Sequence, residues 1–452
     1  MKPESHPMSQ ALMPTESVAA LGAPAPDPAQ PELLAAINRA GVARFAELPF
    51  PRRTDQAWRF TTLGSVALEG FAQAIPVPEE QAELLAEQSR AASGETAGRI
   101  SFVNDRLSGR AELAVALAEQ GVIWKPLRQA AEEDSALVRE HLGVRETGLG
   151  SAKYSALHRA HLRAGVVLFV PRNTEVALPL HAFHWLSGRG SAVFPHTLII
   201  AGENSKLTVV DHFQSADPAE AGFACAVSDI VAGAGAKVTY VCLQDWSERS
   251  TSFQLSTVRL AKDASVTTLH MNLGSAWSRV ESRSFLSGEG ARSDMLALGV
   301  ATGGQEYDLR TFQDHLAPGA SSDLLYKNAL ADKARTIFAG LIRVEPGAHR
   351  TDAYQTNRNL LLSDEAEANS MPGLEILADD VKCSHGATTA QLSPDELFYL
   401  QARGIPPLVG KQLLVAGFLG EVLDRLNHPR LATQLHAAVD AKLARAHVAD
   451  GA

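Results

Sequence analysis

Cys383 and His385 are the residues of this chain whose types and spacing most suggest chemistry. Only Ser384 separates them. On an extended strand, side chains two residues apart point to the same face, so a thiol and an imidazole would lie side by side. A soft thiolate with an imidazole suits zinc or iron–sulfur chemistry. A closed zinc site usually takes four ligands, so the remaining ligands of any metal here must come from elsewhere, most simply from another subunit.

Packing is the competing role for this pair and for the chain's weaker candidates. A free cysteine is commonly a small buried hydrophobe, so an arbitrary Cys-x-His pair is more often structural. Cys225 and Cys242 stand in apolar runs and are predicted to be core residues. His181 and His184 flank Phe183 and are predicted to be strand histidines at a surface or edge. The chain contains neither a Gly-x-Ser-x-Gly nor a His-Glu-x-x-His motif.

The composition describes a soluble globular protein. Its 452 residues suffice for about two to three domains. The net charge of −10 argues against a nucleic-acid partner, because neutralising phosphates needs clustered Lys and Arg. Three cysteines are too few for a disulfide framework and favour a reducing compartment. Since no signal peptide and no apolar run near the roughly 20 residues of a membrane span is found, we expect a cytoplasmic protein.

The elements that must position Cys383 and His385 belong to a repeat. An apolar stretch, a short turn and a new extended run recur eight times, at intervals of 27 to 33 residues. Such a period predicts a solenoid, and the β-branched runs cut by Gly, Asn and Asp predict a parallel β-helix. A sandwich with evenly spaced turns is the competing fold. The turns end at Thr174, Ser205, Ala236, Ala264, Ala291, Ala320, Ala348 and Val381.

One face of the repeat changes character towards its C-terminal end. The second and fourth residues after each turn share a strand face, and in the earlier copies these positions are mostly apolar. In the last two copies they are Arg350 with Asp352, and Cys383 with His385. We therefore expect an ionisable patch at the C-terminal end of the solenoid.

Four regions are expected along the chain. Residues 1–30 are rich in Pro and Ala and predict a disordered leader. Residues 31–160 predict a helical domain, with helices from Pro31, at Pro78 and over Pro126–Leu142, and an extended piece at 100–103. Residues 161–392 form the β-helix core. Residues 393–452 predict a C-terminal helical domain, beginning with Ser393 as N-cap and Pro394 at the first helical position.

The residues around the Cys383–His385 pair also resemble a known family. The stretches 380–388 (DVKCSHGAT) and 397–405 (LFYLQARGI) resemble the C-terminal signature of the SufB/SufD scaffold proteins of iron–sulfur cluster assembly. The stretch 194–213, Leu178 to His181 and the element starting at Trp58 are similar to earlier parts of that family. The likeness spans about residues 45 to 430. SufB-like chains read Glu-His-Glu-Ala-Thr at the signature, so this chain resembles the SufD-like members.

The resemblance implies a fold, partners and a role. The fold would be a right-handed parallel β-helix flanked by N-terminal and C-terminal helical domains. The chain would be a non-enzymatic scaffold that pairs with a SufB-like paralogue and binds the SufC ABC-type ATPase through residues 393–452. His385 would match the histidine at the interface where a transient iron–sulfur cluster forms, with Cys383 beside it. A homodimer of the isolated chain is also compatible with the resemblance.

Two alternatives remain open at this point. A carbohydrate-active β-helix enzyme would place paired carboxylates and basic residues in a groove, with Arg310, Asp314 and Arg350 as candidates. A SufB-like scaffold would instead accept sulfur on Cys225 or Cys242.

Overall fold

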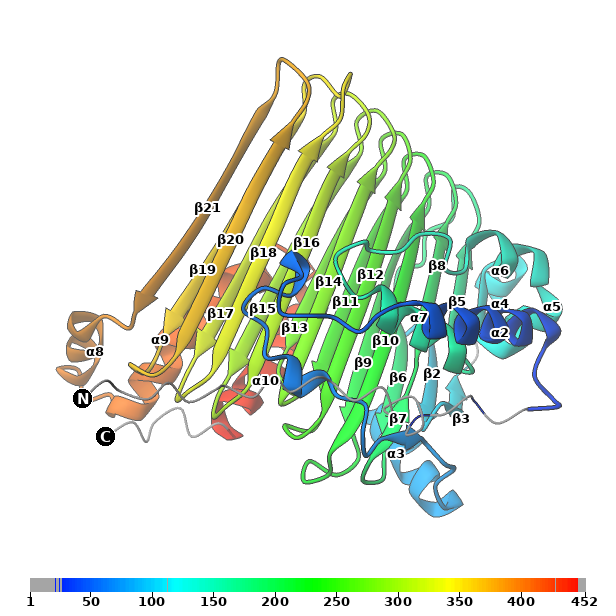
Figure 1. Cartoon of the computed structure of the whole chain (residues 1–452), viewed down its shortest axis with the longest axis horizontal. Helices are drawn as coiled ribbons and strands as arrows, with labels where there is room; N and C mark the ends of the chain where they lie inside the picture. The colour runs from blue at the N-terminus through cyan, green and yellow to red at the C-terminus, as the bar shows by residue number, and fades with distance from the viewer. Residues whose placement is uncertain (1–20, 22–23, 25–26, 112, 427, 446–452) are drawn as a thin grey trace, which may run out of the picture.

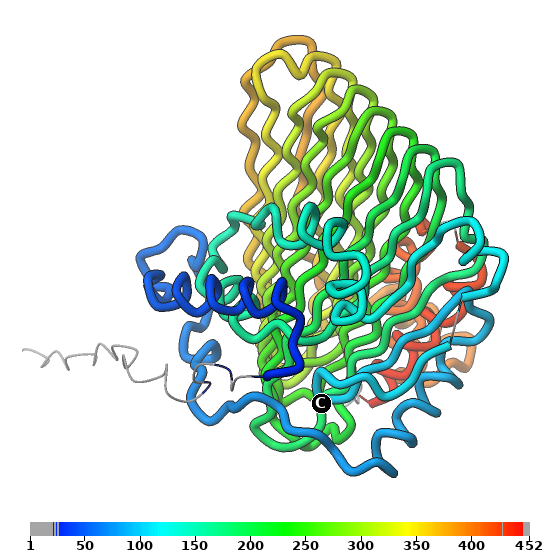
Figure 2. The backbone as a smooth tube through the Cα atoms, turned by 90° about the vertical axis from the view of Figure 1, so that its right-hand side faces the viewer, coloured from blue at the N-terminus to red at the C-terminus, as the bar shows by residue number. Residues whose placement is uncertain are grey.

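The chain is built around a parallel β-helix, as the repeat predicts. The computed structural model describes residues 21, 24, 27–111, 113–426 and 428–445. Each coil contributes one strand to each of two sheets, so a strand pairs with the strand that lies two further along the sequence. All pairings from β8 to β21 are parallel, which excludes the sandwich. Figure 2 shows the coils stacked one upon another.

Two sheets form the walls of the β-helix. Sheet A consists, in spatial order, of β4 (Ile123–Pro126), β5 (Gly165–Val170), β8 (His196–Ala201), β10 (Gly222–Ala232), β12 (Thr251–Leu260), β14 (Trp277–Leu286), β16 (Glu306–His315), β18 (Arg335–Val344) and β20 (Glu367–Ile376), with β7 (Ser191–Val193) and β1 (Ala72–Gln73) attached beside β10. Sheet B consists of β3 (Arg106–Ala111), β2 (Gly98–Val103), β6 (Leu180–Leu186), β9 (Lys206–Ser215), β11 (Lys237–Asp245), β13 (Ser265–Asn272), β15 (Arg292–Ala301), β17 (Ser321–Leu330), β19 (Asp352–Leu361) and β21 (Lys382–Gln391).

A left-handed residue at one corner explains the sequence repeat. The residue two positions before each sheet B strand from β9 to β21 has a φ between 53° and 70°, a conformation that Gly, Asn and Asp adopt most readily. The residue after it is small and buried in most coils. These corner residues are Asn204, Gly235, Asp263, Gly290, Gly319, Arg350 and Asp380.

This corner corrects the register expected for the second-last copy. The sequence Pro-Gly-Ala348 resembles Pro-Gly-Ala320, but Arg350, and not Gly347, occupies the corner before β19. Strand β19 therefore starts three residues later than expected. The partners of Cys383 and His385 on β19 are Ala353 and Gln355, so the predicted pair of Arg350 and Asp352 is wrong. The ionisable pair is confined to the last coil.

Helices and short strands precede the β-helix. Predicted helices are confirmed from Glu32 and from Glu79, and the extended piece at 100–103 is part of β2. The single helix expected over Pro126–Leu142 is wrong, because the chain breaks at Asp134 into two short helices. The elements are α2 (Glu32–Glu47), the 3-10 helices η2 (Gln56–Trp58) and η3 (Leu63–Val66), α3 (Glu79–Ser93), α4 (Val115–Glu119), α5 (Leu127–Glu133), α6 (Ser135–His141) and α7 (Ala152–His161).

Most of the leader expected over residues 1–30 lies outside the described residues. Its described end, from Asp27 to Gln30, forms a turn. The Asp27 carboxylate lies 2.8 Å from the Arg128 guanidinium on α5.

Among the described residues, three helices follow the β-helix: α8 (Pro394–Gln401), α9 (Pro407–Asp424) and α10 (Pro429–Arg445). The Ser393 hydroxyl accepts a hydrogen bond from the Glu396 amide and Pro394 opens the helix, which confirms the predicted start. The buried faces of α9 and α10 pack against the outer side of sheet B. Among the N-terminal elements, α2, α5, α7 and the segment around Trp58 cover sheet A instead, so they and the C-terminal helices lie on opposite faces of the β-helix (Figures 1 and 2).

Candidate functional site

Cys383 and His385 lie on the inner face of β21, the last strand of sheet B. Their register partners Ala353 and Gln355 point into the interior of the β-helix and are at most 1% exposed. Because register partners on parallel strands point the same way, the thiol and the imidazole also face inwards. The structure therefore brings the two predicted residues onto one face.

The coil that carries these residues is the open end of the β-helix. Within the part of the chain that the structure describes, strands β20 and β21 each pair with one neighbour only. Their inner-face residues have no further coil above them, so Leu374 and Ile376 of β20 are 36% and 39% exposed. One coil earlier, their respective partners Ile342 and Val344 are fully buried. Figure 1 shows these two strands at the edge of the stack.

Burial keeps the Cys383 thiol protonated at neutral pH. The side chain is half-buried and packs against a small cluster that contains Ile342, Val344 and Ala353. This burial, together with the nearby Asp352 carboxylate, raises the pKa of Cys383, although a backbone hydrogen bond at Ala353 opposes the shift. The thiolate is the form that binds metal, so a cation or a metal must arrive before Cys383 can act as a ligand. His385 is exposed on the same strand.

The site within this chain is incomplete as a metal centre. Among the residues that the structure describes, no three His, Cys, Asp or Glu side chains come together as a ligand set. Two inward-facing ligands at an open end can contribute half of a four-ligand site.

The weaker histidine candidates are buried and do not join this site. His181 and His184 are 1% and 3% exposed, which corrects the expected surface or edge position. Strand β6 lies between β2 and β9, so it is not an edge strand. The short strand β2 gave no sign in the sequence that it would pair with β6. The His184 ring stacks between Phe102 and Phe213, and burial lowers its pKa to about 3. His184 is therefore a neutral packing residue.

Cys225 and Cys242 are core residues, as predicted. Cys225 lies under α7, and its thiol donates a hydrogen bond to the Tyr154 carbonyl at 3.5 Å. Cys242 faces the interior between Asp211 and His270 on the neighbouring strands. Burial raises the pKa of both thiols, so neither has the exposed, acidic character of a reactive cysteine.

The three candidates for a carbohydrate-cleaving site do not converge. Arg310 is buried and pairs with Asp308. Asp314 pairs with Arg283 at 2.7 Å on the neighbouring strand. Arg350 stands in the corner before β19 with 67% of its side chain exposed. These residues stabilise separate parts of the fold.

Sequence reasoning missed a buried charge network on the outer side of sheet A. The Arg279 guanidinium lies 2.8 Å from Glu281 and 2.6 Å from Asp308, and all three side chains are fully buried. Arg279 also lies under the Trp58 ring at 4.0 Å. The segment at Trp58 and Thr61 covers this network, with the Thr61 hydroxyl donating to Asp308 at 2.6 Å. The sequence shows alternating charged residues on β14 and β16. A strand face of this kind predicts exposure to solvent, so the sequence did not indicate that these residues are buried.

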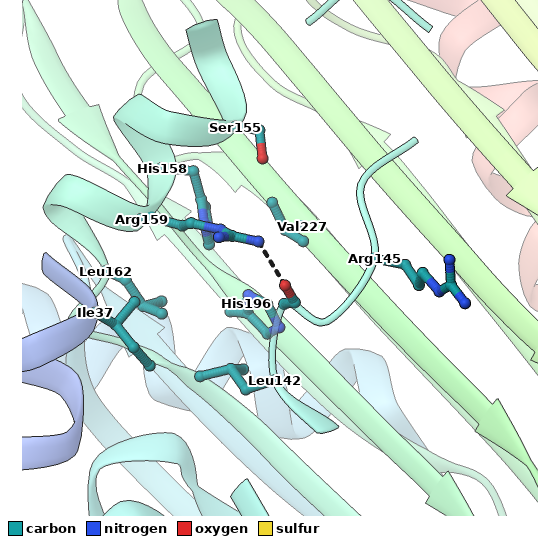
Figure 3. Close-up of a pocket in the computed structure, with 10 residues that line it drawn as sticks. Ile37, Leu142, Arg145, Ser155, His158, Arg159, Leu162, His196 and Val227 are labelled. Carbon is teal, nitrogen blue, oxygen red and sulfur yellow. Dashed lines mark hydrogen bonds between the residues drawn. The ribbon is translucent and has the colours of Figure 1, made fainter. Parts of the chain in front are cut away.

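A small cavity lies near the other end of the β-helix. Its volume is about 70 Å³. It lies between α7, the loop at Leu142 and Gly143, and sheet A (Figure 3). The His196 imidazole lies 3.3 Å from the Asp229 carboxylate, and the Gly143 amide donates to the same carboxylate at 2.8 Å. His196 is six strand spacings from β20, roughly 29 Å, so the cavity is separate from the terminal coil.

The fold and the geometry define a class of protein: a parallel β-helix whose last coil is open and carries a thiol and an imidazole on its inner face, with helices attached to sheet B. The family model described as "SUF system FeS cluster assembly, SufBD core domain" matches residues 184–418, just over half of the chain. The chain belongs to the SufBD family of iron–sulfur cluster assembly proteins.

Individual relatives agree with this assignment. A SufBD family protein of Synechocystis is 28% identical over 410 residues, covering 87% of this chain and 88% of the relative. The iron–sulfur cluster assembly protein SufD of Bacillus subtilis is 30% identical, covering 75% of this chain and 78% of its own. SufD of Escherichia coli is 33% identical over 61% of this chain and 66% of its own. Among the described helices, none has the length and apolarity to cross a membrane.

Proposed function

We propose that this chain is a SufD-like scaffold subunit that supplies half of a cluster assembly site. The observation that carries the proposal is the placement of Cys383 and His385 on the inner face of an uncovered last coil. The nascent iron–sulfur cluster is cargo that passes through the site and is not a resident cofactor. In this role the chain binds and orients and does not turn over a substrate.

The partner that completes the site is a SufB-like paralogue. Unpaired strand edges of β20 and β21 present backbone donors and acceptors that a strand of another chain can pair with. Exposed apolar side chains of Leu374, Ile376 and Leu377 lie at the same end. A related parallel β-helix would extend the sheets across the gap and bring further soft ligands to Cys383 and His385. Without the paralogue, two copies of this chain can form a homodimer through the same strand edges.

An ABC-type ATPase of the SufC kind would bind at α8 and α9. Large apolar side chains are exposed there although the rest of α9 is packed on sheet B. Phe398 is 70% exposed, and Tyr399 and Leu413 are 56% and 51% exposed. An exposed apolar patch of this kind marks an interaction surface.

The proposal is tested in a reconstituted complex with the paralogue and the ATPase. His385→Ala should lower the rate of ATP-dependent cluster assembly at least tenfold, measured by absorbance and by activation of a recipient apoprotein. His349→Ala is the matched control, because His349 is exposed in the turn before β19 and hydrogen-bonds to the Asp379 carbonyl. A complex with His385→Ala that assembles clusters at the parent rate would remove His385 from the site.

The same complex tests the role of Cys383. Cys383→Ser removes the soft ligand and keeps the size of the side chain. We expect slower assembly than in the parent and a smaller loss than with His385→Ala, because the thiol must first lose a proton whose pKa is raised by burial.

A further inference from the structure

The C-terminal helix α9 is tied to the β-helix by one acidic residue that contacts two strands. The Glu421 carboxylate pairs with the Lys327 ammonium of β17 and lies 3.5 Å from the Arg358 guanidinium of β19. The Lys327 side chain is 3% exposed and also donates to the Phe418 carbonyl at 2.8 Å. The hydrogen bond from Lys327 lowers the pKa of Glu421, so the carboxylate is charged at neutral pH.

The contacts of Glu421 follow one line across the outer face of sheet B. Leu298, Lys327, Arg358 and Thr388 are register partners on β15, β17, β19 and β21. Leu298 is buried beneath the C-terminal helices. The next two residues of this row, Lys327 and Arg358, are charged, and both contact Glu421 of α9. A second contact, 2.6 Å between Arg425 and Asp323, fixes the same helix to β17.

The next strand, β21, is attached to the helices in a different way. Its Thr388 is exposed, and no described residue of α9 forms an ion pair with β21. Instead, β21 ends at Gln391 and continues into α8 through two residues, Leu392 and Ser393. Two neighbouring strands, β19 and β21, are thus connected to two neighbouring helices, α9 and α8, by different means.

We infer that Glu421 is a positioning residue that holds α9 and β19 together, so that a partner acting on α8 and α9 shifts β21 relative to β19. This inference rests on the proposed binding of an ATPase to α8 and α9. With α9 fixed to β17 and β19, a change in the angle between the helices is passed through residues 392–393 to the strand of Cys383 and His385. The parallel hydrogen-bond ladder between β19 and β21 is the part that changes, because no second described strand pairs with β21.

The test uses the full complex with the ATPase and the paralogue. Glu421→Gln keeps the size of the side chain and removes the charge that bridges Lys327 and Arg358. Asp424→Asn is the matched control, because Asp424 is an exposed acid one turn further along α9. Arg358→Gln removes only the contact with β19 and leaves Lys327 paired, so it remains informative if Glu421→Gln does not fold.

Four quantities are measured: retention of the ATPase, the rate of ATP hydrolysis, the ATP-dependent change in amide hydrogen exchange over residues 382–391, and the rate of cluster assembly. Glu421→Gln should keep the first two within twofold of the parent. It should reduce the ATP-dependent change in exchange by more than half and slow assembly at least threefold, with Arg358→Gln between it and the parent. A residue with a purely structural role would not separate ATP hydrolysis from exchange at β21.

The outcomes separate the inference from the proposed function. If the parent complex retains the ATPase and both variants behave like Asp424→Asn in exchange and assembly, the inference on Glu421 is overturned and the proposed function stands. If the parent chain binds no ATPase, the proposed function of α8 and α9 is overturned, and the inference is overturned with it.

Discussion

The two ends of the β-helix differ in whether further parts of the chain cover them. At the N-terminal end, β2, β3 and β4 extend the sheets, and the segments around Trp58 and α7 cover the outer face of sheet A. At the C-terminal end, no described residues add a further coil or a cover over the inner faces of β20 and β21. Charged groups beneath the cover on sheet A pair with each other, whereas Cys383 is half-buried and His385 is exposed on the open last coil. Buried polar groups that are paired hold a fold together, and exposed ones at an open end are free to bind.

The largest effect on stability should come from the covered face. Arg279→Met removes the cation between Glu281 and Asp308. It leaves the fully buried Glu281 carboxylate without its ion-pair partner, whereas Asp308 keeps its contact with Arg310. Breaking a buried ion pair from one side costs about 3–5 kcal/mol, and we expect a loss of this size in the free energy of unfolding measured with urea. Arg189→Met, at an exposed turn, should change it by less than about 0.5 kcal/mol. Equal values for the two variants would show that the network does not stabilise the fold.

A smaller, pH-dependent effect is expected from the interior of the covered half. Burial raises the pKa of Asp211 from 3.8 to about 6, although hydrogen bonds from the Thr197 and Tyr240 hydroxyls oppose the shift. The folded state therefore holds a proton that the unfolded state releases, and stability falls as the pH rises from about 4 to about 6. A difference of about two pKa units corresponds to roughly 3 kcal/mol.

Asp211→Asn isolates this contribution because the amide cannot titrate and its oxygen can accept both hydroxyl hydrogen bonds. Urea unfolding at several pH values should show that the variant gains stability relative to the parent between pH 4 and pH 6 and keeps that gain above pH 6. Asp424→Asn serves as the exposed control and should follow the parent. Parallel curves for the parent and Asp211→Asn would contradict the assigned pKa.

The smallest stability effect should come from the open end. His385→Ala removes an exposed side chain, so the free energy of unfolding of the isolated chain should change by less than about 0.5 kcal/mol. The same substitution should nevertheless abolish most of the assembly activity of the complex. A loss of more than about 2 kcal/mol in the isolated chain would mean that His385 supports the fold, and the contrast between the two ends would disappear.

Local patterns in the sequence were sufficient to predict the solenoid and to predict that Cys383 and His385 share one strand face. The sequence period follows from one backbone requirement, a left-handed corner residue in each coil, such as Asn204, Asp263 or Gly290. Because few residue types adopt this conformation readily, the requirement can be recognised in the sequence. The helix start at Ser393 and Pro394 is likewise a local effect of capping. Strand alternation alone places Cys383 and His385 on one face.

Tertiary structure decided which residues meet across long separations and which faces are covered. The corner before β19 is at Arg350, because pairing with β17 and β21 outweighs the local likeness of Pro-Gly-Ala348 to an earlier turn. Arg279 is buried because the segment with Trp58 and Thr61, more than 200 residues earlier, and the backbone at Leu149 lie over it and its ion-pair partners. The openness of the last coil is likewise a property of the stack. The sequence determined that a thiol and an imidazole share one strand face. The fold determined that this is the inner face of the last coil and that no further described coil covers it, because burial depends on what packs above a strand and not on the strand itself.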